Sequence, residues 1–331
     1  MDQIELQQIF FNHIKAKLPG HFSMVDEVAE MLNISNDSAY RRIRGEKQLS
    51  LNELRTLCLH FKISLDQLMG LQTNAIVFYG DLVDNANFVF ENYLISMQHN
   101  VDKIAAIPNC HFYYEAKDIP PFHHFQYPEL AAFKYFFWMR TVLQDYTQSK
   151  KIFDFNEFSG PIADAGKKIA LKYSKINSTE IWNIETVNSS IRQIEFCFET
   201  GMFADKKSVV KIFEELLQLI EHIETEAANG FKFVNGSNNK NPELNFNLYI
   251  NEVLLGHNSM LVDNEVQRFA YINHNVLNFM ITYDKRFCDY TYNSMQNIIR
   301  KSSLISRVNE KERTKFFNSI KNRIKERIQL I

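Results

Sequence analysis

Serine residues at helix-start spacing in the segment 23–70 constrain the fold of this chain more than any other feature. A serine hydroxyl at an N-cap accepts a hydrogen bond from a free backbone N–H of the first helical turn, and a carboxylate or amide three residues later can bond back to the cap. Three such pairs occur: Ser23 with Asp26, Ser50 with Glu53, and Ser64 with Gln67. A shorter helix is expected to begin after Ser35 and end at Gly45. The segment therefore predicts a succession of short helices.

The apolar residues of the first two of these helices predict how they pack. Each helix has one apolar face, made by Val25, Val28, Ala29 and Leu32 in the first helix and by Ala39 and Ile43 in the second. The small side chain of Ala29 allows the second helix to cross close to the first. Asn33, in the turn between them, tolerates the left-handed backbone that such a turn often needs. These features predict a helix-turn-helix.

The same segment carries a resemblance to a known family. The residues that carry it are Val28-Ala29, Leu32 to Ser35, Ala39, Arg44-Gly45, Ser50-Leu51 and the run from Ile63 to Leu68. Over about residues 4–70 the chain resembles the Cro and phage-repressor type of helix-turn-helix, the xenobiotic-response-element regulators. The resemblance implies a five-helix, all-α DNA-binding domain whose third helix enters the major groove. Two positions depart from the family pattern: Asn33 replaces the usual turn glycine, and Arg42 stands where the family usually buries an apolar residue.

The polar side of the expected third helix, about residues 36–44, supplies candidate DNA contacts. Asparagine can pair with adenine, and arginine with guanine, through two hydrogen bonds each. The candidates for reading base edges are Asn36, Asp37, Ser38 and Arg41. The candidates for contacting phosphates, which position a protein on DNA, are Tyr40, Arg42, Arg44 and Lys47. The alternative is that these charges only form the solvated surface of a small helical domain.

Composition limits the partners and the compartment. The chain has 331 residues, 45% of them hydrophobic, and a formal net charge of −2. It can therefore form a small and a larger core, but it has no general excess of positive charge for nucleic acid, and any DNA contact must come from local clustering. The cysteines are isolated and lack metal-ligand spacing; they are Cys58, Cys110, Cys197 and Cys288. This pattern predicts a reduced, cytoplasmic protein without a metal. The most apolar run, 130–143, is too short to span a bilayer, and no cofactor is expected.

The rest of the chain, residues 75–331, is expected to be a second domain, joined to domain 1–70 by the short hinge 72–74. Its patterns predict helices at 85–106, 128–145, 162–173 and through most of 179–228. They predict strands at 110–115 and, as an antiparallel meander, at 246–253, 259–263, 268–272 and 277–282. The predicted fold class is mainly α: a five-helix N-terminal helix-turn-helix domain, followed by a larger, mostly helical α+β domain with a small antiparallel sheet near 246–282.

The second domain is large enough to dimerise the protein or to sense a ligand. Tyr249, Asn251 and Tyr271 are candidates for lining a small-molecule pocket, and filling a core is the alternative for these side chains. The tail 300–331 carries ten Lys and Arg residues against three Glu, so it is either a docked helix with a solvated basic face or an accessory contact to the DNA backbone. No spare apolar face is expected on the small domain, which places a dimer contact in residues 75–331.

No set of residues indicates catalysis or metal binding. His111, His123 and His124 lack acidic or cysteine partners at ligand spacing, and adjacent histidines point in different directions on a regular element. No nucleophile, base and orienting group can be assembled from the sequence. The expectation is therefore a homodimeric, bacterial-type transcription regulator that binds double-stranded DNA and performs no chemistry of its own. An enzyme carrying a helix-turn-helix and a protein-interaction scaffold are the alternatives.

Overall fold

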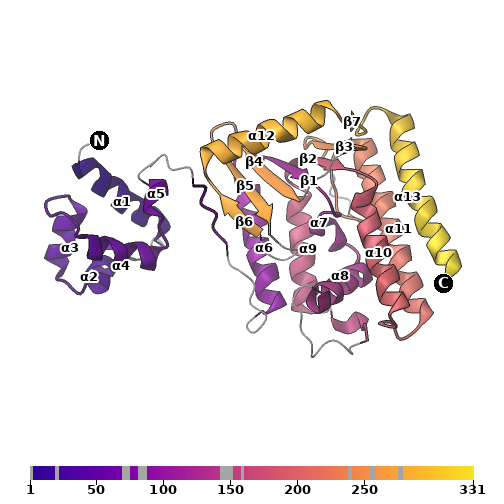
Figure 1. Ribbon diagram of the computed structural model, residues 1–331, viewed down its shortest axis with the longest axis horizontal. Helices are drawn as coiled ribbons and strands as arrows, with labels where there is room; N and C mark the ends of the chain where they lie inside the picture. Colours follow the sequence, from indigo (N-terminus) through magenta and orange to yellow (C-terminus); the bar gives the residue numbers. More distant parts are fainter. Residues whose placement is uncertain are drawn as a thin grey trace. The chain divides into compact units, whose positions relative to one another are not determined.

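The chain divides into two compact units, Met1–Val77 and Phe78–Ile331 (Figure 1). The structure, a computed structural model, describes residues 3–18, 22–68, 75–80, 88–141, 152–157, 160–237, 241–253, 258–274 and 279–331. The division falls a few residues beyond the hinge expected at 72–74, which itself lies outside the described residues. Each unit has its own hydrophobic core.

Unit 1 is helical throughout its described regular structure. Its helices are α1 (Gln3–Lys17), α2 (Met24–Leu32), α3 (Asn36–Ile43), α4 (Leu51–Phe61) and α5 (Leu65–Leu68). The serine spacing placed the starts of α2 to α5 correctly: Ser50 and Glu53 form a complete capping box at α4, and Ser35 accepts a hydrogen bond from the N–H of Ser38. Asn33 ends α2 with a left-handed backbone, at φ 52° and ψ 52°. The turn between α2 and α3 is therefore short and fixed by local chemistry.

A buried arginine fixes the rotation of α3. Arg42 is only 4% exposed, and its guanidinium donates to Glu53 Oε1 at 2.6 Å and to the carbonyl oxygen of Ser38 at 3.0 Å. Gln7 of α1 adds a second tie, because its side chain donates to the carbonyl oxygens of Arg42 and Lys47. Position 42 is thus buried although it holds an arginine, because the carboxylate of Glu53 neutralises the charge.

Helix α4 leaves two large apolar side chains in solvent. Leu51 is 84% exposed and Leu59 is 67% exposed, two turns apart along the helix. Two exposed leucines do not by themselves make the contiguous apolar patch that marks an interaction surface. The expectation that unit 1 has no spare apolar face therefore stays a prediction.

Unit 2 is built on a mixed sheet. Its strands are β1 (His111–Glu115), β2 (Asn177–Trp182), β3 (Phe246–Ile250), β4 (Ser259–Asp263), β5 (Arg268–Asn273), β6 (Phe279–Thr282) and β7 (Ser303–Leu304). Among the described residues they form one seven-stranded sheet in the order β6-β5-β4-β1-β2-β3-β7. The three central strands β1, β2 and β3 pair in parallel, and the flanking strands pair antiparallel.

The predicted fold class, mainly α with a small antiparallel sheet near 246–282, is wrong. The four predicted strands exist, but β1 and β2 separate β3 from β4, so they do not form a meander, and the unit is α/β. Strand β2 overlaps the start of the stretch 179–228, most of which was predicted to be helical. A parallel strand buried on both faces shows no apolar–polar alternation, and β2 additionally hides a glutamate among its buried residues, so its sequence carries no strand period.

Helices cover the sheet of unit 2 (Figure 1). They are α6 (Phe90–Ala105), α7 (Pro121–His124), α8 (Pro128–Thr141), the 3-10 turn η2 (Phe155–Glu157), α9 (Pro161–Tyr173), α10 (Glu185–Glu199), α11 (Lys206–Asn229), α12 (Lys285–Arg300) and α13 (Glu310–Leu330). Helix α12 packs on β4 and β5 in a small cluster around Leu261, Ala270, Cys288 and Met295. The residues that alternate with these along the strands belong to the main core with α6 to α11 and α13.

The basic C-terminal tail is a docked helix. Lys321 of α13 donates to Glu224 of α11 at 2.7 Å, and Arg327 pairs with Glu195 of α10. Arg313 is 9% exposed and donates to backbone carbonyl oxygens. These contacts use the basic side chains to hold α13 against its neighbours, which favours the docked alternative over a contact with DNA.

All four cysteines are free thiols, and Cys110, Cys197 and Cys288 are buried. Within the described ranges, no helix combines the length and the apolar character needed to cross a bilayer.

Replacing Arg42 by alanine should destabilise unit 1 by about 3 kcal/mol, because it leaves Glu53 without its partner and opens a gap beneath α3. Hydrogen exchange of the full chain would measure the change, as faster exchange of amides in α2 to α4 but not in β2. Arg41→Ala, which removes the same charge from an exposed neighbour, is the matched control. Equal exchange in the two variants would show that the buried ion pair does not hold unit 1 together.

Candidate functional site

The side of α3 that faces away from the core of unit 1 carries most of the predicted DNA contacts. Ala39 and Arg42 point into the core, whereas Asn36, Asp37, Tyr40 and Arg41 are exposed. The side chain of Arg41 is 56% exposed and that of Tyr40 is 44% exposed. Helical spacing therefore presents Asp37, Tyr40 and Arg41 on one solvent-facing surface.

Tyr40 and Arg44 form a pair at the C-terminal end of this surface. The guanidinium carbon of Arg44 lies 4.4 Å from the centre of the Tyr40 ring, and its Nη2 donates to the tyrosine hydroxyl at 3.1 Å. Glu46 lies 3.6 Å from Arg44 and 3.8 Å from Arg41, a distance at which exposed ion pairs are weak. Both guanidinium groups therefore remain accessible to an anion.

The start of α3 is partly engaged within unit 1. Asn36 Nδ2 donates to Asp26 Oδ1 at 2.8 Å, which leaves its carbonyl oxygen and its second N–H for another partner. Asp37 is exposed, and Ser38 is half-buried with its backbone used in the cap and in the bond from Arg42. Of the predicted base-reading residues, Asn36, Asp37 and Arg41 are therefore the accessible ones.

The prediction that Arg42 contacts a DNA phosphate is wrong, because its side chain is buried and bonded to Glu53. The prediction put the Arg42 side chain on the solvent-facing side of α3, whereas the structure has it on the side that faces the core. Lys47, which follows α3 in the chain, is exposed, as is Arg44, so the remaining predicted phosphate contacts stay on the surface.

The structure does not bring together the predicted ligand residues of unit 2. Tyr249 on β3 pairs with Ile181 and faces the opposite side of the sheet from Tyr271, which is in register with Met260, Tyr114 and Glu180. Three strands lie between β3 and β5, which separates them by roughly 19 Å. Asn251 is buried and donates to Ser302 Oγ. A pocket lined by Tyr249, Asn251 and Tyr271 is therefore excluded.

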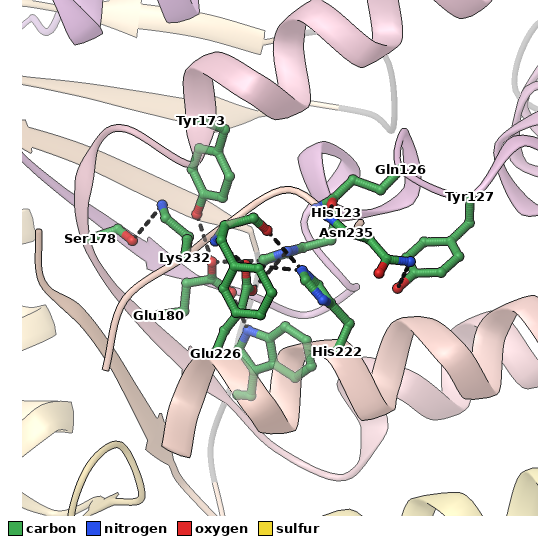
Figure 2. A network of polar contacts seen from close by, with 12 residues as sticks. His123, Gln126, Tyr127, Tyr173, Ser178, Glu180, His222, Glu226, Lys232 and Asn235 are labelled. Carbon is green, nitrogen blue, oxygen red and sulfur yellow. Dashed lines mark hydrogen bonds and ion pairs between the residues drawn. The ribbon is translucent and has the colours of Figure 1, made fainter. Parts of the chain in front are cut away.

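A network of charged residues lies inside the core of unit 2 (Figure 2). At its centre Glu180 of β2, fully buried, accepts hydrogen bonds from His123 Nε2 at 2.9 Å, the Tyr173 hydroxyl at 2.6 Å and Trp182 Nε1 at 2.8 Å. Burial alone would raise the pKa of Glu180, but the favourable contacts, with His123 foremost, hold it below its ordinary value. The carboxylate is thus stabilised in its charged form.

A second carboxylate and a lysine complete the network. Glu226 of α11 accepts from the Phe233 N–H at 2.8 Å and lies 3.3 Å from His222 Nε2 (Figure 2). Lys232 donates to Ser178 Oγ at 2.7 Å and stands 3.4 Å from the centre of the Tyr173 ring. Burial lowers the pKa of Lys232 from 10.5 to about 8, although Glu180 and Glu226 oppose the change. The network joins β2, α7, α9 and α11.

Most of these groups are paired with one another, which favours a structural role. The exception is Glu226 Oε2, which is buried without a hydrogen-bond partner and lies 4.0 Å from His123 Nδ1. Burial would lower the pKa of His222, but the bond to Glu226 and the carbonyl of Phe233 raise it instead. Among the residues that the structure describes, no three His, Cys, Asp or Glu side chains are arranged to hold a metal ion. The network can hold charge and protons inside the core, but the contacts found around it are to the protein itself.

The sequence did not reveal this network, although it contains one signal for it. His222 and Glu226 fall within the buried stripe of α11, where Leu219 and Ile223 are fully buried. A charged residue within such a stripe predicts a buried partner, since an unpaired charge there is too costly. The partner on β2 could not be identified because the strand itself was missed.

Comparison of the chain with protein-family models, with curated proteins and with solved structures finds no match. The function of the chain is therefore inferred from the geometry within each of its two units.

The lowered pKa of Lys232 predicts a pH dependence of stability. Between about 8, its pKa in the folded protein, and 10.5, the ordinary value, the unfolded chain holds a proton that the folded protein has released, so the free energy of unfolding rises with pH. From about pH 7 to about pH 9 this residue should contribute a rise of about 1 kcal/mol. Denaturant unfolding of the full chain at both pH values would measure it.

Lys232→Met should remove that part of the rise. The exposed residue Lys168 of α9 provides the control, since Lys168→Met removes a lysine that is not buried. If Lys232→Met and Lys168→Met show the same change between the two pH values, Lys232 is not the group that titrates.

Proposed function

We propose that this protein is a sequence-specific, DNA-binding transcription regulator that works in the cytoplasm, with α3 as the helix that enters the major groove. The observation that carries the proposal is the rotation of α3, which buries Ala39 and Arg42 and leaves Tyr40, Arg41 and Arg44 accessible. A short helix with its polar side free and its start capped can enter a major groove about 12 Å wide.

The accessible side chains have the chemistry needed to bind DNA. Arg41 lies on the exposed side and can donate two hydrogen bonds to guanine, whereas Asn36 retains one donor and one acceptor for adenine. Arg44 and Lys47 lie toward the end of the helix, where they can neutralise phosphates. The net charge of −2 fits a protein whose affinity for DNA comes from this one surface.

For unit 2 we propose dimerisation and ligand sensing, without catalysis. The clearest cluster of ionisable groups, around Glu180, is buried and internally bonded, so it does not present a nucleophile or base to a substrate. One recognition helix covers only a few base pairs, and regulators of this kind pair two half-sites about 34 to 36 Å apart. A homodimer is therefore part of the proposal.

Arg41→Ala should weaken binding by about 1 to 3 kcal/mol at a single base position and relax the preference there. Arg44→Ala should weaken binding to all sequences alike and make it less dependent on salt. Selection from a random DNA pool, followed by gel shifts at several salt concentrations, would measure both effects. Arg192→Ala on α10 is the control, because that side chain is 71% exposed and lies in the other unit. Unchanged sequence preference in Arg41→Ala would contradict the assignment of this residue.

The full chain should be a dimer at micromolar concentration, as measured by light scattering. The contact is expected in unit 2, and the exposed leucines of α4 provide the comparison. Leu59→Lys should leave the dimer intact if the dimer contact lies in unit 2. A monomeric Leu59→Lys variant would indicate that the contact lies in unit 1. A monomeric wild-type chain would exclude the two-fold arrangement altogether.

A further inference from the structure

A cavity lies between β1, α7, α8 and the strand pair β5–β6 in unit 2. Its volume is about 40 Å³, and it is partly open to solvent. Tyr93, Tyr114 and Trp138 supply aromatic walls, and Asp118, His124 and Lys134 supply ionisable groups. This combination of apolar walls and a few polar groups is typical of small-molecule sites.

Two of the ionisable groups have buried polar atoms without a hydrogen-bond partner among the described residues. His124 is 2% exposed, and neither of its ring nitrogens is bonded. Asp118 Oδ1 is likewise buried and unbonded. Buried polar atoms almost always have a partner, so a histidine with both nitrogens unsatisfied beside a cavity points to a polar occupant there, either water or a ligand.

The third group, Lys134, has one donor left. Its ammonium is buried, in a residue only 3% exposed, and donates to Ser190 Oγ at 2.7 Å and to Gln193 Oε1 at 2.6 Å. An ammonium has three N–H groups, so the third is available to a ligand. Burial lowers the pKa of Lys134 to about 8, which leaves it mainly charged near neutral pH, and burial keeps the pKa of His124 well below its ordinary value, so this ring is neutral.

We propose that this cavity is the effector site of the regulator and that it binds the head group of a small zwitterionic α-amino acid. The carboxylate accepts from Lys134 and His124, and the ammonium donates to Asp118. The proposal rests on the regulatory function proposed above. The positive charge of Lys134 and the negative charge of Asp118 balance, which favours a ligand without net charge over a plain anion or cation. The cavity is small, so it holds the charged groups of the ligand at its closed end, and its open side leaves room for the α-carbon and a short side chain.

The cavity is connected to the segment that leads into unit 1. Phe279, at the start of β6, lines the cavity, and Ile281 of the same strand exchanges two backbone hydrogen bonds of 2.7 Å with Tyr79. Gly80 lies so close to this strand that a Cβ there would be 2.9 Å from the carbonyl oxygen of Phe279. A ligand that shifts Phe279 therefore acts directly on the strand that holds residues 79–80.

Three compounds of matched size test the ligand chemistry: L-alanine, L-lactate and propionate differ only in carrying an ammonium, a hydroxyl or a hydrogen on the α-carbon. With the full chain, alanine at about ten times its Kd should raise the unfolding midpoint by about 3 °C, lactate should raise it less, and propionate least. The remaining common amino acids are screened in the same way. Equal shifts of the midpoint for alanine and lactate would contradict the proposal that the ligand is a zwitterion. If no amino acid shifts the midpoint, the cavity is not an amino-acid site.

Substitutions of Asp118 and Lys134 test which side chains contact the ligand. Asp118→Asn should abolish the preference for alanine over lactate while keeping the shape of the site, and Lys134→Met should lower the affinity for all three compounds at least tenfold. Lys168→Met, an exposed lysine, should change nothing. Should Lys134→Met fail to fold, Asp118→Asn alone decides, because retention of the alanine preference in that variant contradicts the proposal.

A final measurement separates this proposal from the proposed function. The DNA affinity of the full chain is measured with and without the amino acid that gives the largest shift. A change in affinity supports the effector role. Ligand binding without any DNA binding would overturn the regulator and leave the amino-acid site standing, whereas DNA binding without ligand binding would overturn the site alone.

Discussion

The carboxylate of Glu180 in the middle of β2 is the constraint on which unit 2 depends. A charge buried in a sheet is tolerated only when hydrogen bonds and an opposite charge replace the water it has lost. Here the replacements come from His123 on α7, Tyr173 at the end of α9 and Lys232 beyond α11. These three residues belong to different elements of the chain. The hydrogen bonds and charges around one carboxylate therefore fix the positions of several helices on one face of the sheet.

Unit 1 also contains a buried charge that is neutralised by an opposite charge, and this pair determines which side chains the proposed DNA-binding surface exposes. Arg42 is held inward by Glu53, so its neighbour Arg41, one position earlier on the helix, must point outward. Successive residues of a helix are about 100° apart, which means that the ion pair determines which arginine is available to a ligand. Arg42 therefore stabilises unit 1, and Arg41, the residue before it, is the one proposed to contact DNA.

The sequence predicted what depends on local chemistry and failed where distant residues decide. The starts of α2, α3 and α4 follow from Ser23, Ser35 and Ser50, because a cap acts within one turn. The sheet was underestimated, since β2 pairs with strands that lie more than sixty residues away and has no alternating pattern. The same limit explains why Arg42 was taken for a surface residue: its partner on α4 is visible only in three dimensions.

In the proposed regulator, the pairing of Phe78 and Tyr79 with the rest of unit 2 would set how much energy a ligand needs to release the start of this unit. Tyr79 is held to β6 by two backbone hydrogen bonds, and Phe78 packs edge to face on Phe287 at 5.1 Å. Hydrogen bonds contribute about 0.5 to 1.5 kcal/mol each and an aromatic pair about as much, so pairing is worth on the order of 2 to 4 kcal/mol. Allosteric coupling energies are typically about 1 to 3 kcal/mol. To release or fix this pairing, a ligand of the proposed regulator would need a preference of roughly 30- to 700-fold for one of the two states.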